Sequence, residues 1–94
     1  MLIVRNSFVA KPGQASKLAA MFKDLGTAAQ IPKYRVMTDV TGEFNRVFFE
    51  FEVASIAEFE QRLHEYSTNP IFREKMQGYT DLWITGSREI LRVM

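Results

Sequence analysis

Few side chains in this sequence could do chemistry at neutral pH, and His64 is the first of them. It is the chain's only histidine, and imidazole is the side chain whose ordinary pKa lies closest to neutrality. His64 follows Glu60 by four residues in a segment with helical spacing, so one expectation is a surface pair with this carboxylate. The alternative is that His64 lines a cleft and acts there as a base or ligand. His64 is therefore a candidate catalytic residue.

Asn6 is the second candidate catalytic residue, because it interrupts an apolar face. In residues 2–10, Asn6 shares one side of a predicted strand with Leu2, Val4 and Phe8, and this side should face the core. A buried amide without a hydrogen-bond partner costs about 1–3 kcal/mol. Asn6 is expected either to bond a helix end or loop or to hold a ligand.

Glu50 and Glu52 form a third candidate group. They share one face of residues 46–53 (RVFFEFEV), at a spacing of about 7 Å that would suit an acid and a base acting on one substrate. The competing explanation is charge pairing with neighbouring strands, and we prefer it because it accounts for both signs of charge. The expected partners are Arg5, Arg35, Arg88 or Arg92.

Aromatic residues should wall the space between the predicted sheet and its helices. Most of them belong to the core, but each polar tip needs a partner, and an aromatic cleft with a few hydroxyls suits a flat organic ligand. The candidate ligand-binding residues are Phe8, Phe22, Tyr34, Phe59, Tyr66, Phe72 and Trp83.

Four strands are predicted to position these residues. Period-two alternation predicts strands over residues 2–10, 33–40 and 46–53, the last two joined as a hairpin. A fourth strand is predicted over at least residues 87–93, after a bend or bulge at Gly86.

Helices are predicted between the strands. Helical spacing predicts a helix over residues 14–25 that ends at Gly26 as a left-handed cap. Ser55 and Glu58 form a capping box for a second helix, and Asn69-Pro70 begins a short third one. This order predicts a ferredoxin-like α+β fold, in which a four-stranded antiparallel sheet carries its helices on one face.

The opposite face of the sheet mixes charged and large apolar side chains. Such a face is too apolar for solvent and too charged for a dry core, so we expect a second copy of the chain to cover it. The 94 residues form one domain, 1–94, at a size where a second chain often completes the core. The homodimer interface is predicted to contain Arg5, Arg35, Met37, Phe48, Glu50, Glu52, Arg88 and Arg92.

Composition argues against several classes of partner. The 12 basic and 11 acidic residues interleave to a net charge of +1, which gives no field to attract nucleic acid or anionic lipid. There is no cysteine for a thiolate metal site, and the first residues read neither as a signal peptide nor as a membrane span. We expect a cytoplasmic protein without a nucleic-acid partner, a membrane or a cofactor.

The whole chain resembles the dimeric α/β-barrel superfamily, in which two ferredoxin-like subunits join their sheets into one barrel. The resemblance rests on the order of elements, the strand-to-helix entry at 9–14, the passage 46–60 and the short helix beginning at 69–72. The superfamily includes antibiotic-biosynthesis-type monooxygenases, heme-degrading monooxygenases, small lactone isomerases, stress-responsive proteins and NIPSNAP-like groups. The resemblance implies a homodimeric barrel with its helices outside.

The heme-degrading members have an asparagine at the position of Asn6, where it helps to activate bound oxygen. They also use a tryptophan and a heme-ligating histidine, and these two positions correspond to Arg62 and Met76 here. The resemblance therefore does not imply heme degradation.

The functional expectation is binding of an apolar or aromatic small molecule between sheet and helices. Resemblance to cofactor-independent monooxygenases implies that the protein holds an electron-rich phenol or quinol and helps to deprotonate it, so that the substrate's own electrons activate oxygen. Asn6, Tyr34, His64 and Trp83 would then be the residues to test. Two alternatives stay open: a non-catalytic stress-responsive or structural dimer, and a small isomerase with an acid and a base facing one cavity.

Overall fold

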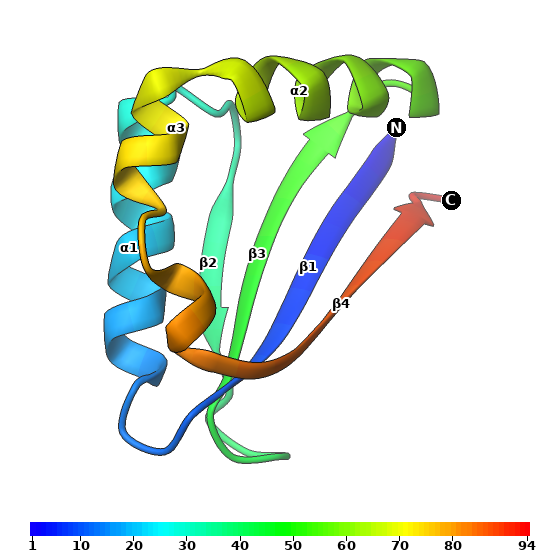
Figure 1. Ribbon diagram of the computed structural model, residues 1–94. Helices are drawn as coiled ribbons and strands as arrows, with labels where there is room; N and C mark the ends of the chain where they lie inside the picture. Colours follow the sequence, from blue (N-terminus) through cyan, green and yellow to red (C-terminus); the bar gives the residue numbers. More distant parts are fainter.

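The computed structural model describes residues 1–94 and contains the elements in the predicted order. The strands are β1 (Leu2–Ala10), β2 (Arg35–Thr38), β3 (Arg46–Val53) and β4 (Trp83–Arg92). The helices are α1 (Ala15–Ala28), α2 (Ile56–Thr68), α3 (Pro70–Lys75) and a short 3-10 helix, Tyr79–Asp81, that leads into β4. All strand pairs are antiparallel, in the order β2-β3-β1-β4, so the predicted ferredoxin-like α+β fold is confirmed (Figure 1).

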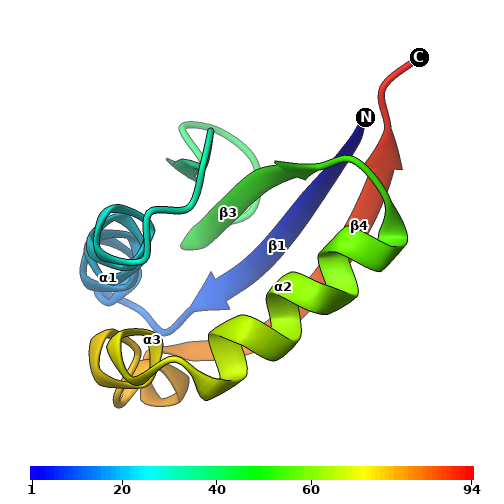
Figure 2. The same ribbon diagram turned by 90° about the horizontal axis from the view of Figure 1, so that it is seen from above.

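The three α-helices cover one face of the sheet and leave the other face bare (Figure 2). Helix α1 packs against β2, β3 and β1, while α3 packs beside α1 and α2 contacts β3. Lys75 Nζ lies 3.0 Å from Asp24 Oδ2 and ties α3 to α1. Strand β4 forms the edge of the sheet far from α1, and most of its residues are exposed (Figure 1).

The hydrophobic core lies between the sheet and the helices. The apolar residues at alternate positions of β3 are all buried, as the period-two pattern predicts: Val47, Phe49, Phe51 and Val53. The ring of Phe22 from α1 packs with its centroid 5.3 Å from that of Phe49. The helices therefore pack on the face of β3 that carries these buried residues.

The prediction that Gly26 caps α1 is wrong, because the helix continues to Ala28. Gly26 is instead a point of close approach: a Cβ atom there would lie 2.5 Å from the ring of Tyr34. The Tyr34 hydroxyl donates to the carbonyl of Lys23 at 3.0 Å and lies 2.9 Å from the hydroxyl of Thr27. The missing side chain thus makes room for a tyrosine ring that joins α1 to β2.

The caps of the other two helices agree with the sequence. Ser55 Oγ accepts from the backbone N–H of Glu58 at 3.1 Å, and the Glu58 carboxylate in return accepts from the backbone N–H of Ala54. Asn69 Oδ1 accepts from the backbone N–H of Ile71 at 2.9 Å, with Pro70 in the first turn of α3. β2 begins later than predicted because Lys33 has a positive φ of 51°, which is incompatible with a strand, and it ends at Thr38 rather than at residue 40.

The side assigned to β4 was predicted wrongly. In the register of β1 with β4, Asn6 pairs with Arg88 and Leu2 with Arg92, so both arginines lie on the helix side of the sheet rather than the bare side. The irregularity in the pairing lies between Val9 and Ala10 of β1, not at Gly86. Because side chains alternate along a strand, a one-residue error in the register of β4 against β1 moves every side chain of β4 to the other face of the sheet.

Candidate small-molecule site

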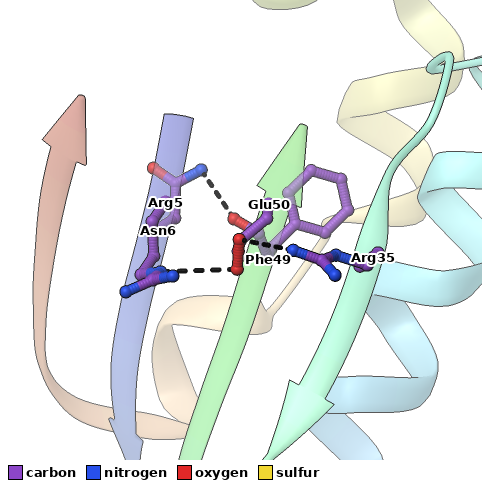
Figure 3. Close-up of polar contacts among 5 residues, drawn as sticks. All are labelled: Arg5, Asn6, Arg35, Phe49 and Glu50. Atoms are coloured by element: carbon purple, nitrogen blue, oxygen red, sulfur yellow. Dashed lines mark hydrogen bonds and ion pairs between the residues drawn. The ribbon is translucent and has the colours of Figure 1, made fainter. Parts of the chain in front are cut away.

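Asn6 is the polar centre of the helix-facing side of the sheet. Its Nδ2 donates to the backbone carbonyl of Phe49 on β3 at 3.3 Å (Figure 3). Its Oδ1 accepts from Nε of Arg88 on β4 at 2.7 Å. The partners of Asn6 are therefore a strand carbonyl and an arginine, and not the predicted helix end or loop.

Arg88 was predicted on the bare face of the sheet but lies on the helix side, next to Asn6. Besides its bond to Asn6, its guanidinium carbon lies 5.3 Å from the ring centroid of Phe59, a buried residue of α2. This is a cation–π contact that holds the guanidinium against the helix layer. Neither Nη nitrogen has a hydrogen-bond or carboxylate partner within the chain.

A cavity of about 110 Å³ opens next to this pair, between the sheet and the helices. Asn6 and Arg88 form its polar end, and the remainder of its wall is apolar or aromatic. Four of the predicted ligand-binding residues line it: Phe8, Phe22, Tyr66 and Phe72. Seven further residues complete the wall: Leu25, Ile31, Phe49, Phe51, Leu63, Met76 and Tyr79.

Three predicted ligand-binding residues lie outside this lining. The Tyr34 ring stacks on Phe49 with centroids 5.8 Å apart, and it lies between α1 and β2 rather than in the cavity. Phe59 packs on Phe51 and lies beneath the Arg88 guanidinium. Trp83 packs its ring 5.4 Å from that of Phe8, and its buried Nε1 has no acceptor in the chain. These three residues therefore pack against side chains that line the cavity and do not line it themselves.

His64 is exposed on α2 and does not line the cavity. Its backbone carbonyl accepts from the hydroxyls of Ser67 and Thr68, while no ion pair joins its side chain to Glu60. The structure therefore does not bring the two candidate catalytic residues, Asn6 and His64, into one site.

A larger surface groove of about 700 Å³ adjoins the cavity along α2 and α3. Four residues line both spaces and form the wall between them: Tyr66, Phe72, Met76 and Tyr79. Within this wall the rings of Tyr66 and Phe72 stack with centroids 5.4 Å apart at an angle of 11°. Only these side chains separate the cavity from the groove.

Glu50 lies on the opposite, bare face of the sheet and is only 2% exposed. Arg5 Nε lies 3.3 Å from one carboxylate oxygen and Arg35 Nη2 lies 3.2 Å from the other (Figure 3). Both oxygens are engaged, so the geometry agrees with charge pairing and not with a proton-transfer role. The proposed pairing with Arg88 or Arg92 is wrong, because those residues are on the other side of the sheet.

Glu52 pairs with Lys33 at 3.8 Å on the same bare face, where the Lys33 side chain is exposed and the Glu52 side chain is partly exposed. Glu89 and Leu91 occupy the positions on β4 that were predicted for arginines, opposite Arg5 and Ile3. No three histidine, cysteine or acidic side chains lie together as metal ligands would. None of the helices is both long enough and apolar enough to cross a membrane.

The sequence matches no protein-family model and no curated protein. Several solved structures nevertheless share its fold over nearly their whole length. An uncharacterized NIPSNAP domain protein from Burkholderia xenovorans superposes with a TM-score of 0.86 at 14% identity, covering 100% of this chain and 95% of that one. A NIPSNAP family protein from Agrobacterium tumefaciens superposes with a TM-score of 0.86 at 12% identity, covering 99% and 92%.

An antibiotic biosynthesis monooxygenase superposes with a TM-score of 0.72 at 15% identity, covering 100% of this chain and 99% of that one. At these identities the similarity concerns the fold alone. The predicted resemblance is confirmed at this level: the chain has the ferredoxin-like fold that NIPSNAP-domain proteins share with this monooxygenase.

Proposed function

We propose that this protein binds a small apolar or aromatic molecule in the cavity between its sheet and helices. The observation that carries the proposal is an aromatic cavity of about 110 Å³ with one polar end, formed by Asn6 and Arg88. An apolar cavity of roughly 150 Å³ suffices to bind benzene, so this cavity holds a single ring at most and the rest of a larger ligand would occupy the adjoining groove.

The catalytic form of this proposal is oxidation of the bound molecule by dioxygen without an added cofactor. Support comes from the fold shared with an antibiotic biosynthesis monooxygenase and from the positive charge of Arg88, which would stabilise a deprotonated, electron-rich substrate. For a phenol, one oxygen atom of O2 becomes the new quinone oxygen and the other leaves as water. The two hydrogens of that water come from the C–H bond that is oxidised and from the phenol O–H. The substrate supplies all four electrons. His64 has no part in this scheme because it lies outside the cavity.

The test is turnover of 1-naphthol to 1,4-naphthoquinone under labelled dioxygen, with oxygen uptake and quinone absorbance as readouts. We expect one labelled oxygen in the quinone, loss of activity in Arg88→Gln and retention in His64→Ala. If the protein binds electron-rich phenols but does not oxidise them, it is a binding protein and the monooxygenase proposal is wrong. Failure of every aromatic molecule to bind would overturn the whole proposal.

A non-catalytic role is the second candidate, and the bonding of Asn6 favours it. The amide already has partners at both of its ends within the chain, as a purely structural residue would. The isomerase alternative has no such support, because Glu50 lies on the opposite side of the sheet from the cavity and His64 lies outside it.

We further propose that two copies of this protein associate through the bare face of the sheet. That face carries partly exposed Met37 and Phe48 around the buried Glu50. The corrected interface retains Arg5, Arg35, Met37, Phe48, Glu50 and Glu52 and replaces Arg88 and Arg92 by Glu89 and Leu91. Phe48→Glu should convert a dimer into a monomer in native mass spectrometry, while Phe44→Glu in the exposed hairpin should not. An unchanged mass for Phe48→Glu, or a monomeric wild type, would overturn this interface.

A further inference from the structure

We propose that the ligand of the cavity carries a carboxylate that Arg88 binds. The inference rests on the proposed small-molecule binding and adds the chemical class of the ligand. Arg88 is the only charged side chain that lines the cavity, so it alone can select for charge there.

Arg88 and Arg92 are the arginines of the sheet that have no carboxylate partner, and of the two only Arg88 lines the cavity. Arg5 and Arg35 share Glu50, Arg46 pairs with Asp39, and Arg62 pairs with Glu58. Arg88 has instead a neutral amide on one side and an aromatic ring beneath it. Its charge is positioned by the fold and remains available to an anion.

The geometry of the guanidinium indicates which anion fits. Nε is occupied by the bond to Asn6, and Asn6 is itself held by the carbonyl of Phe49. The edge formed by the two Nη atoms remains, and it presents two parallel N–H donors at the spacing of the two oxygens of a carboxylate. A phenolate has one oxygen and would use only one of these donors.

The remainder of the ligand must be apolar and small. Phe8, Phe22 and Leu25 surround the space beyond the polar end, which matches one aromatic ring. A second ring would enter the groove past Tyr66 and Phe72. The best match is thus an aryl carboxylate of one or two rings, and any hydroxyl that is oxidised would be carried on the rings.

The experiment compares three naphthalene probes by isothermal titration calorimetry: 2-naphthoate, 2-naphthamide of equal size, and the smaller 2-naphthol. We expect the wild-type protein to bind 2-naphthoate about tenfold more tightly than 2-naphthamide, because a charge-assisted bidentate bond exceeds a neutral one by this order. Arg88→Gln should lose this preference while still binding 2-naphthamide. Arg88→Lys should keep part of it, because lysine retains the charge but not the fork.

The matched control is Arg92→Gln, since Arg92 lies on the same strand and the same side as Arg88 but outside the cavity. It should bind all three probes as the wild type does. Equal affinity for 2-naphthoate and 2-naphthamide, tighter binding of 2-naphthol, or an equal loss in Arg92→Gln would overturn the carboxylate assignment alone. Failure of all three probes to bind would overturn the small-molecule function and this inference with it.

Discussion

Arg88 and Asn6 lie directly opposite each other in the β1–β4 pair, and Arg88 Nε donates a 2.7 Å hydrogen bond to Asn6 Oδ1. Through its Nδ2, Asn6 extends this connection to the carbonyl of Phe49 on β3. One amide therefore joins three strands at the polar end of the cavity. The same two bonds stabilise the sheet and orient the only charge that a ligand in the cavity would meet.

Replacement of Asn6 by alanine should destabilise the protein by about 1–3 kcal/mol, because two hydrogen bonds are lost and one of them involves a charged group. Urea denaturation followed by circular dichroism measures this change. Ser7→Ala is the matched control, since Ser7 lies next in the chain and faces the other side of the sheet. It should change stability by less than about 0.5 kcal/mol. Equal effects of the two variants would show that Asn6 has no special structural role.

Glu50→Gln should destabilise the protein because it leaves Arg5 and Arg35 without their common carboxylate. We expect a loss of about 1–3 kcal/mol, below the value for a wholly buried pair, because the Arg35 side chain is 64% exposed and solvent screens its charge. Glu52→Gln removes the exposed pair with Lys33 and should have an effect below about 1 kcal/mol. A Glu52→Gln variant as unstable as Glu50→Gln would contradict this ranking of the two carboxylates.

Gly26→Ala tests the close approach of Tyr34 to α1. Alanine favours a helix by about 1 kcal/mol over glycine, but its Cβ would lie 2.5 Å from the Tyr34 ring. Overpacking should outweigh the helical preference and give a net destabilisation of about 1 kcal/mol in thermal unfolding. In a Tyr34→Ala background the same substitution should become stabilising, because the clash is gone. Destabilisation in both backgrounds would mean that the ring is not the cause.

The capping box of α2 should make stability depend on pH. The backbone N–H of Ala54, followed by the Arg62 guanidinium, holds the pKa of Glu58 below its ordinary value. A carboxylate with a lowered folded-state pKa stabilises the protein above its unfolded-state pKa, and the contribution is lost as the pH falls through the folded-state pKa. Glu58→Gln should therefore be less stable than wild type at neutral pH, with the gap closing on acidification.

The control for this pH dependence is Glu60→Gln, because Glu60 is exposed on the same helix and has no bonded partner. Urea-denaturation midpoints of the wild type and both variants, measured between neutral pH and about pH 2, give the stability difference of each variant from wild type at each pH. A Glu58→Gln gap that stays constant with pH would contradict the role of the charged carboxylate.

The order of elements could be predicted because β1 and β3 alternate with period two and α2 and α3 carry caps that bond locally. The importance of Asn6 was also visible, since a polar residue on an apolar strand face stands out. The role of Arg88 was not, because β4 is exposed at most positions on both faces and carries no alternation that reveals its sides. Only the pairing with β1 places Arg88 next to Asn6.

For Gly26 and His64, the sequence suggests a role that the tertiary structure does not give them. A glycine near a helix end predicts a cap, but its reason here is Tyr34, a residue that contacts it only in the folded chain. A lone histidine suggests chemistry from its pKa, but α2 turns its side chain away from the cavity that Leu63 lines. In both cases the deciding neighbour comes from tertiary structure.

Binding of an aromatic molecule inside the cavity is the central claim, and an NMR titration with benzene tests it most directly. Benzene is a single neutral ring that dissolves to millimolar concentration, so it reports on the cavity without depending on Arg88. We expect intermolecular nuclear Overhauser effects from benzene to the methyl groups of Leu25, Ile31, Leu63 and Met76, four residues of the cavity wall. Benzene at millimolar concentration that gives no such contacts, with these side chains packed against one another, would contradict the claim.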